Sequence, residues 1–174
     1  HLSTLGDTIS KIALEKGGIT RKGVPMIVAP QPHEALVVFR ELAEKNEVAM
    51  IDVGAQMSWQ KAHTDMEGQT FKAEGLRGPY HLWMPLLGDH QLENAATAVA
   101  TVEALANQGF PVSKDSIVDG LREVRWPGRL DVLSTDGPLV VVDGAHNPYS
   151  SRRLVQAVRD YFHFSRVILI FGAL

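Results

Sequence analysis

The segment that most constrains the fold is an apolar run at residues 139–142, which leads directly into Asp-Gly-Ala-His-Asn-Pro at 143–148. The apolar run predicts a buried strand, Gly144 permits a turn, and Pro148 suits the first turn of a helix over 149–162. Open α/β sheets bind ligands in such connections, at the carboxyl ends of their strands. We therefore expect Asp143 to accept hydrogen bonds from ribose hydroxyls, with His146 beside it. In the alternative interpretation, Asp143 caps the helix and His146 is a surface residue.

The start of the chain predicts a short helix that ends in a glycine pair. Residues 9–16 place apolar side chains on one helical face, which Asp7 or Thr8 can cap and Gly17-Gly18 can end. Lys16 therefore lies at the end of this helix. A cation in the last turn is also what the helix dipole favours, so a purely structural role for Lys16 stays open.

A second, longer helix is predicted from Asp89, its expected N-cap, to about residue 107. Asn94 lies near its start, where an amide can both donate and accept, as recognition of an adenine edge requires. The alternative for Asn94 is an exposed helix residue that contacts only solvent. The expected buried stripe of this helix consists of Leu92, Ala95, Ala96, Val99, Val102 and Leu105.

Arg129 follows Trp-Pro-Gly at 126–128, where proline and glycine end any helix and indicate a boundary. An Arg fixed by a turn between two domains can bind phosphate through two parallel hydrogen bonds. A surface Arg near a hinge is the structural alternative.

The segments at 1–19, 88–100 and 126–150 together resemble the folylpolyglutamate synthase and dihydrofolate synthase family, relatives of the Mur ligases. The resemblance rests on His-x3-Leu-Gly-x-Thr followed by Lys at the start of the chain, on Gly-x-His-Gln-x2-Asn-Ala-Ala in the long helix, and on Trp-Pro-Gly-Arg-Leu and Asp-Gly-Ala-His-Asn-Pro. Gly17 departs from the family, which usually has Ala there; we expect it to loosen the helix end.

The resemblance implies a role for each candidate residue. His1 would be a magnesium ligand, and Lys16 would be carbamylated, which turns a cationic amine into an anionic oxygen ligand for Mg²⁺. Asn94 would contact adenine, Arg129 would contact ATP phosphate, and Asp143 and His146 would complete the nucleotide site, with His146 and Lys16 also serving catalysis. The implied cofactors are ATP and Mg²⁺.

Composition excludes several other classes of function. With 45% hydrophobic residues, 21% charged residues and a net charge of -3, the chain is typical of a globular protein and not of a nucleic-acid binder. No apolar run reaches the roughly 18 residues of a membrane-spanning helix, and the start has no secretory signal. The chain has no Cys, which excludes disulfides and suits the cytoplasm.

The predicted fold class is α/β, Mur-ligase-like. Residues 1–125 would form the back part of a parallel-sheet ATPase domain, 126–129 a hinge, and 130–174 the start of a Rossmann-like C-terminal domain. The remaining predicted elements are strands at 26–29, 48–53, 69–74, 80–85, 130–133 and 167–171, and helices at 32–43 and 114–123, with 69–74 and 80–85 antiparallel.

We expect the parent protein to be a monomeric ATP-dependent ligase that joins L-glutamate to a folate or dihydropteroate carboxylate through an acyl phosphate. Because no Gly-x4-Gly-Lys-[Ser/Thr] phosphate loop is present, we expect the chain to be a fragment that is inactive alone. Two alternatives stay open: a Mur-type peptidoglycan ligase and a non-catalytic α/β fragment.

Overall fold

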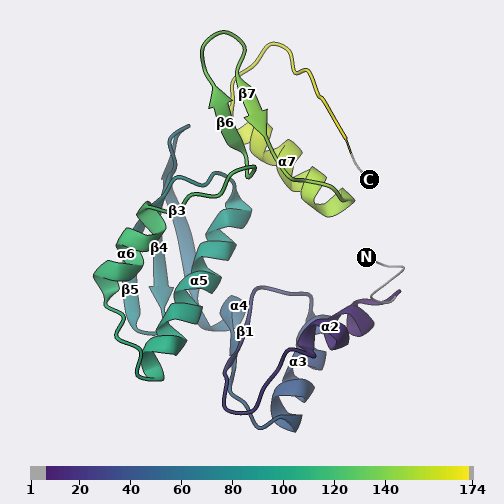
Figure 1. The fold of residues 1–174 in the computed structure, drawn as a ribbon, viewed down its shortest axis with the longest axis vertical. Helices are drawn as coiled ribbons and strands as arrows, with labels where there is room; N and C mark the ends of the chain where they lie inside the picture. Colours follow the sequence, from purple (N-terminus) through teal and green to yellow (C-terminus); the bar gives the residue numbers. More distant parts are fainter. Residues whose placement is uncertain (1–6, 173–174) are drawn as a thin grey trace. The chain divides into compact units, whose positions relative to one another are not determined.

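The computed structural model describes residues 7–172, which fall into two units (Figure 1). The first unit contains the chain up to Ser58 together with Glu74–Pro79 and Glu93–Val112; the second contains Trp59–Ala73, Tyr80–Leu92 and the chain from Ser113 onward. The elements, in chain order, are α2 (Ile9–Gly17), β1 (Met26–Val28), α3 (His33–Lys45), β2 (Met50–Asp52), α4 (Val53–Gln56), β3 (Ser58–Thr64), β4 (Gln69–Gly75), β5 (Gly78–Met84), α5 (Asp89–Asn107), α6 (Lys114–Arg122), β6 (Asp131–Ser134), β7 (Val140–Val142) and α7 (Pro148–Tyr161).

The first unit begins with two packed helices and a parallel strand pair. Thr8 caps α2 by accepting from the Lys11 N–H, as one of the two predicted caps. α2 packs against α3, and β1 pairs in parallel with β2, which confirms the predicted strand-helix-strand unit. None of the helices within residues 7–172 combines the length and apolar character needed to cross a lipid bilayer.

Gly17 does not loosen the end of α2, contrary to the prediction from its sequence. It is buried, and a Cβ built on it would lie 2.1 Å from Leu42 Cδ1 and 3.6 Å from Phe39 Cδ1. The residue is therefore small because α3 packs against the backbone of α2 at this point.

Gly17→Ala is expected to destabilise the chain by about 1–2 kcal/mol, because overpacking outweighs the helix propensity that Ala gains. In a Leu42→Ala background the same change should become neutral or stabilising, since the obstructing methyl group is gone. Urea unfolding of the four variants measures this coupling, with Gly120→Ala, where nothing lies within 4 Å, as control. An equal effect of Gly17→Ala in both backgrounds would contradict the packing explanation.

The long helix α5 runs as predicted, and most of its predicted stripe is buried. Leu92, Ala95, Ala96 and Val99 are buried, but Leu105 is 41% exposed, and Glu103 is fully buried on the same helix. The Glu103 carboxylate accepts from the backbone N–H groups of Leu76 (2.8 Å) and Arg77 (2.9 Å). Glu103 thus fixes the two-residue turn between β4 and β5.

The three strands β3, β4 and β5 form one sheet in that order. Two-residue and four-residue connections between neighbouring strands require antiparallel pairing, as predicted for β4 and β5. The sequence analysis missed β3, whose side chains are mostly exposed and so leave no apolar alternation to detect. α4 was missed because it has only four residues.

The second unit ends in a hairpin, β6–β7, packed with α7 around a small core (Figure 1). The core residues are Leu87, Leu130, Ala157 and Phe162. β7 follows the predicted position, but it is not a buried strand: Val140 is 45% and Val142 42% exposed. It pairs antiparallel with β6 alone among the described strands, so the two strands form a two-stranded sheet.

The predicted strand at 167–171 is wrong. These residues form no strand, and they are largely exposed, with Ile170 at 94%. A strand is defined by hydrogen bonds to a neighbour, and none of the strands within residues 7–172 pairs with this segment. Apolar and β-branched residues alone are therefore insufficient to produce a strand here.

Candidate functional site

The candidate site is formed by two loops of the second unit, residues 128–131 and 143–147. The Gly144 N–H donates to the Gly128 carbonyl at 2.9 Å, which ties the two loops together. The Gly128 N–H donates to Asp131 Oδ2 at 3.1 Å within the first loop. Gly128 (φ 74°) and Leu130 (φ 49°) both adopt the left-handed region, so this loop turns sharply at the end of the predicted hinge.

The Asp143 carboxylate is the centre of the loop pair. Its Oδ2 accepts from the Leu130 N–H at 2.9 Å, and its Oδ1 accepts from the Ala145 N–H at 2.8 Å. Asp143 is partly buried and does not cap α7, which excludes the alternative interpretation of this residue. Each carboxylate oxygen can accept a further hydrogen bond, so the geometry is compatible with an additional donor such as a hydroxyl.

Arg129 and Gly144 lie against each other. A Cβ built on Gly144 would be 2.8 Å from Arg129 Nη1, and Gly144 does not adopt a positive φ. The backbone conformation at residue 144 therefore does not itself require glycine, as the sequence analysis assumed. Instead, the missing side chain leaves room for the Arg129 guanidinium. Arg129 itself is exposed, so its donors are accessible.

His146 is exposed and precedes the cap of α7. Its Nδ1 lies 2.9 Å from the Gly144 carbonyl; because a carbonyl only accepts, Nδ1 is the donor, and Nε2 of the neutral ring is an acceptor. Asn147 caps α7 by accepting from the Ser150 N–H at 2.9 Å. The Ser150 side chain accepts in turn from the Asn147 N–H, which completes a capping box with Pro148 as the first helical residue.

The other predicted site residues lie in the first unit or outside the described part. Lys16 is exposed in the last turn of α2, and Asn94 is exposed in the second turn of α5. His1 lies outside the described residues. Among residues 7–172, no three His, Asp or Glu side chains gather to hold a metal ion. The structure thus brings Arg129, Asp143 and His146 together, and the magnesium site predicted from His1 and Lys16 stays a prediction.

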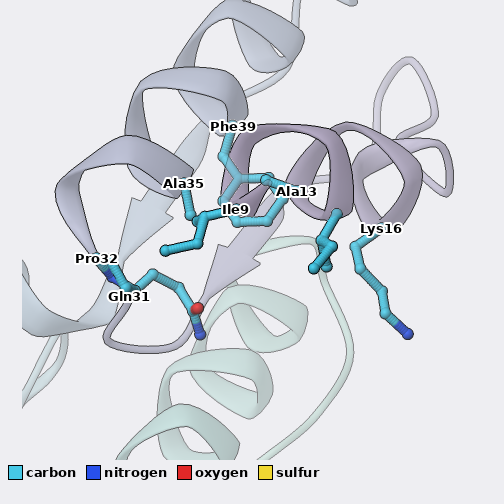
Figure 2. Close-up of a pocket in the computed structure, with 8 residues that line it drawn as sticks. Ile9, Ala13, Lys16, Gln31, Pro32, Ala35 and Phe39 are labelled. Carbon is cyan, nitrogen blue, oxygen red and sulfur yellow. The ribbon is translucent and has the colours of Figure 1, made fainter. Parts of the chain in front are cut away.

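Lys16 borders a groove of about 250 Å³ between α2 and α3. Figure 2 shows Ile9 and Ala13 of α2 facing Ala35 and Phe39 of α3, while the Lys16 side chain extends away from them. The groove lining is apolar apart from Lys16 and Gln31, so it offers few groups for a polar ligand.

Sequence analysis missed a polar cluster that involves the first residue of α5. Lys61 Nζ donates to Asp89 Oδ1 at 2.7 Å, and the Tyr161 hydroxyl donates to the same oxygen at 3.2 Å. Hydrogen bonding from Lys61 lowers the pKa of Asp89, and hydrogen bonding to Asp89 raises the pKa of Lys61, so both stay charged at neutral pH. Sequence separations of 28 and 72 residues leave no local pattern from which this cluster could be predicted.

Comparison with known proteins connects the chain to one family. The sequence family described as "Mur ligase, glutamate ligase domain" matches residues 128–174, beginning within the first loop of the candidate site. The dihydrofolate synthase/folylpolyglutamate synthase of Bacillus subtilis is 31% identical over 176 residues, which cover 100% of this chain and 41% of that protein.

Two solved structures agree in fold. An "FPGS-AMPPCP-folate complex" matches with a TM-score of 0.88 and 34% identity, covering 97% of this chain and 41% of that one. Folylpolyglutamate synthase of Mycobacterium tuberculosis, in complex with ADP and AMPPCP, matches with a TM-score of 0.82 and 30% identity, covering 94% and 38%.

The chain spans between 38% and 41% of the length of these relatives. Its helices and sheets match theirs at sequence identities of 30% to 34% over nearly the whole chain, which confirms the predicted α/β, Mur-ligase-like fold class. The chain belongs to the folylpolyglutamate synthase and dihydrofolate synthase family of the Mur ligase superfamily, of whose members it represents a part.

Proposed function

We propose that the complete protein is an ATP-dependent ligase that joins L-glutamate to the carboxylate of a folate or dihydropteroate. The carboxylate attacks the γ-phosphate of ATP and releases ADP; the amine of glutamate then attacks the carbonyl of the acyl phosphate, which forms the amide and releases inorganic phosphate. The supporting comparisons are the relatives whose names give this activity and the related structures in complex with AMPPCP and folate. A Mur-type peptidoglycan ligase has less support, because the relatives named above are folate enzymes.

The observation that carries the proposal is the loop pair of the second unit. An exposed guanidinium, a carboxylate with spare lone pairs and an exposed imidazole lie within one set of hydrogen bonds. Phosphate is bound by the planar fork of an Arg, and ribose hydroxyls by a carboxylate. We therefore assign Arg129 to ATP phosphate and Asp143 and His146 to the rest of the nucleotide.

The remaining roles follow from the family resemblance. Asn94 would contact adenine, and its exposed amide on α5 is compatible with this. His1 and a carbamate on Lys16 would supply ligands to Mg²⁺. The described residues alone do not form such a site, and the oxygens that a carbamate adds to Lys16 suit this hard cation where an ammonium does not.

The wider organisation is also proposed. We place a domain boundary at residues 126–129, supported by the family match that starts at residue 128 and by the left-handed turn there. An ATPase part would precede this hinge, and the glutamate ligase domain would follow it. We also propose that the complete protein is a monomer and acts in the cytoplasm.

Gly144→Ala tests the nucleotide assignment in the complete protein. The new methyl group would displace the Arg129 guanidinium while leaving the hydrogen bonds of Asp143 in place. We expect KM for ATP to rise about threefold to tenfold, which corresponds to roughly 0.7–1.4 kcal/mol. Arg129→Lys should raise it about tenfold, because a point charge cannot replace the planar fork.

Asp143→Ala is a less clean test of the same assignment. It should weaken ATP binding about tenfold or more, yet it also removes the acceptor of two backbone N–H groups and so disturbs the loops. Gly120→Ala in α6 is the matched control and should leave KM for ATP unchanged. An unchanged KM for ATP in correctly folded Gly144→Ala and Arg129→Lys variants would remove Arg129 from the nucleotide site.

A further inference from the structure

Leu87, in the connection between β5 and α5, is a core residue of the part of the chain that follows the proposed boundary. It is 3% exposed and packs with Leu130, Ala157 and Phe162. The partly buried side chains around this core lie between Val132 and Tyr161, so they also follow the boundary. Leu87 belongs to the same unit as these residues and carries residues 80–92 into their core.

A buried amide fixes the backbone on both sides of Leu87. Gln69 of β4 is 0% exposed, and its Nε2 donates to the Leu86 carbonyl at 2.7 Å and to the Gly88 carbonyl at 3.1 Å. Gly88 adopts a φ of 108°, which is unfavourable for any other residue. Because Leu86 and Gly88 flank Leu87, Gln69 fixes the position from which this side chain enters the core.

The end of α7 reaches the same connection through one hydroxyl. Tyr161, the last residue of α7, donates to Asp89 Oδ1 at 3.2 Å and lies 3.4 Å from Gln69 Oε1. Since a carboxylate and an amide oxygen only accept, the Tyr161 proton is shared between two acceptors. Burial raises the pKa of the Tyr161 hydroxyl, so it stays protonated and able to donate.

Lys61 of β3 orients the Asp89 carboxylate. Lys61 Nζ donates to Asp89 Oδ1 at 2.7 Å and lies 5.6 Å from the centre of the Tyr161 ring. The side chains of Lys61 and Asp89 are 39% and 58% exposed, so their ion pair contributes little stability by itself. Both residues precede the boundary, and their pair therefore prepares an acceptor for Tyr161 on the other side of it.

These contacts are too few to make the two sides of the boundary one rigid body. Domains of one chain move relative to each other unless the interface between them is large and hydrophobic. A contact built on the Leu87 side chain and the Tyr161 hydroxyl is not of this kind. The left-handed turn at Gly128 gives the backbone a place to rotate.

We infer that the Tyr161 hydroxyl is a latch. Bound to Asp89 and Gln69, it holds residues 130–162 in one orientation on residues 59–92, with Leu87 inserted in their core. When the hydroxyl lets go, residues 130–162 turn as a folded part about residues 126–129. The inference rests on the proposed boundary, and it requires nothing of the proposed reaction.

Tyr161→Phe in the complete protein tests the latch, because it removes the hydroxyl and keeps the ring. Trypsin cleavage after Arg125, which is exposed beside the boundary, should become about threefold to tenfold faster without nucleotide, since release frees this segment. Mass spectrometry of the fragments identifies the cleaved bond. Lys61→Met should act in the same direction, and the double variant should show less than the product of the two factors, because both act through Asp89.

Hydrogen exchange distinguishes release from unfolding. In Tyr161→Phe, backbone amides at residues 87–91 should exchange faster, whereas those of β6, β7 and α7 should keep the wild-type rate, because this part moves while folded. Tyr149→Phe is the matched control. It removes a hydroxyl from the same helix, but that hydroxyl accepts from Arg153 of α7 itself. It should change neither the cleavage rate nor exchange at 87–91.

The possible results decide between a latch and a static contact. Cleavage after Arg125 at the wild-type rate in Tyr161→Phe overturns the inference. Faster exchange throughout residues 131–161 also overturns it, since the hydroxyl would then stabilise the fold and not the orientation. A wild-type protein that does not join glutamate to a folate rejects the proposed function instead, and leaves the cleavage and exchange results to decide on the latch.

Discussion

Replacing Lys16 with Ala in the complete protein is expected to lower kcat for glutamate ligation about 100-fold or more. The reason is the proposed carbamate: without the amine no carbamate forms, and Mg²⁺ loses an oxygen ligand whose charge stabilises the transferring phosphoryl group by several kcal/mol. Steady-state kinetics with saturating ATP and glutamate measure the loss. Short-chain carboxylates should restore part of the activity of Lys16→Ala, because they supply the missing oxygen ligand.

Lys16→Arg distinguishes the carbamate from an ordinary helix-end cation. A guanidinium stays charged and is not carbamylated, so we expect this variant to be as inactive as Lys16→Ala. If Lys16 only stabilises α2 by its charge near the C-terminal end of the helix dipole, an interaction worth ~0.3–1 kcal/mol, then Lys16→Arg should leave activity and stability almost unchanged. An active Lys16→Arg variant would therefore reject the carbamate.

A direct measurement complements the kinetics. After incubation with ¹³C-bicarbonate, the complete protein should show a carbamate signal by NMR that is absent in Lys16→Ala. Lys11→Ala is the matched control, because Lys11 is an exposed lysine on the same helix that pairs with Asp7. It should keep both the signal and the activity.

Glu103→Ala is expected to cause the largest loss of stability, about 3 kcal/mol. The carboxylate is fully buried and accepts from two backbone N–H groups at the turn between β4 and β5. Hydrogen bonds to a charged group contribute ~1.5–3 kcal/mol each, and Ala would leave both donors without this acceptor. Glu103→Gln should lose about half as much, since a single amide oxygen remains.

Urea unfolding followed by tryptophan fluorescence measures this loss, because Trp83 lies on β5, the strand that begins directly after the affected turn. Glu41→Ala on α3 is the control. Glu41, like Glu103, is a glutamate in a helix, but its side chain is exposed. It should shift the urea midpoint little. A Glu103→Ala midpoint equal to that of the control would mean that the turn is maintained by its own backbone.

The elements that sequence predicted correctly are those whose signals are local. α2, α3, α5, α6 and α7 have apolar periodicity and recognisable ends, and β1 and β2 are short apolar runs around a helix. β3 and the segment 167–171 failed for opposite reasons. β3 is a strand through hydrogen bonds to β4 although its side chains are mostly exposed, whereas 167–171 is apolar but has no pairing strand among the described elements.

The candidate site could be predicted only in part, because only some of its contacts are between residues close in sequence. Arg129, Asp143 and His146 lie in adjacent loops because a hairpin of few residues joins them, which keeps the contact nearly local. Asp143 was expected to accept hydrogen bonds from ribose hydroxyls, and the sequence did not predict that its carboxylate also accepts from the Leu130 and Ala145 N–H groups. The contacts of Lys61 and Tyr161 with Asp89 join distant segments, which no local pattern of the sequence encodes.

The capping box of α7 limits what this helix can offer to a phosphate. Helix N-termini bind anions through unused backbone N–H groups of the first turn. In α7, Pro148 has no N–H, the Ser150 N–H is given to Asn147, and the Ser151 N–H is given to the Asn147 carbonyl, so only Tyr149 retains an N–H that the cap does not use. If Arg129 binds phosphate as proposed, anion recognition at this end of the helix depends on side chains such as its guanidinium, with the helix dipole as a minor contributor.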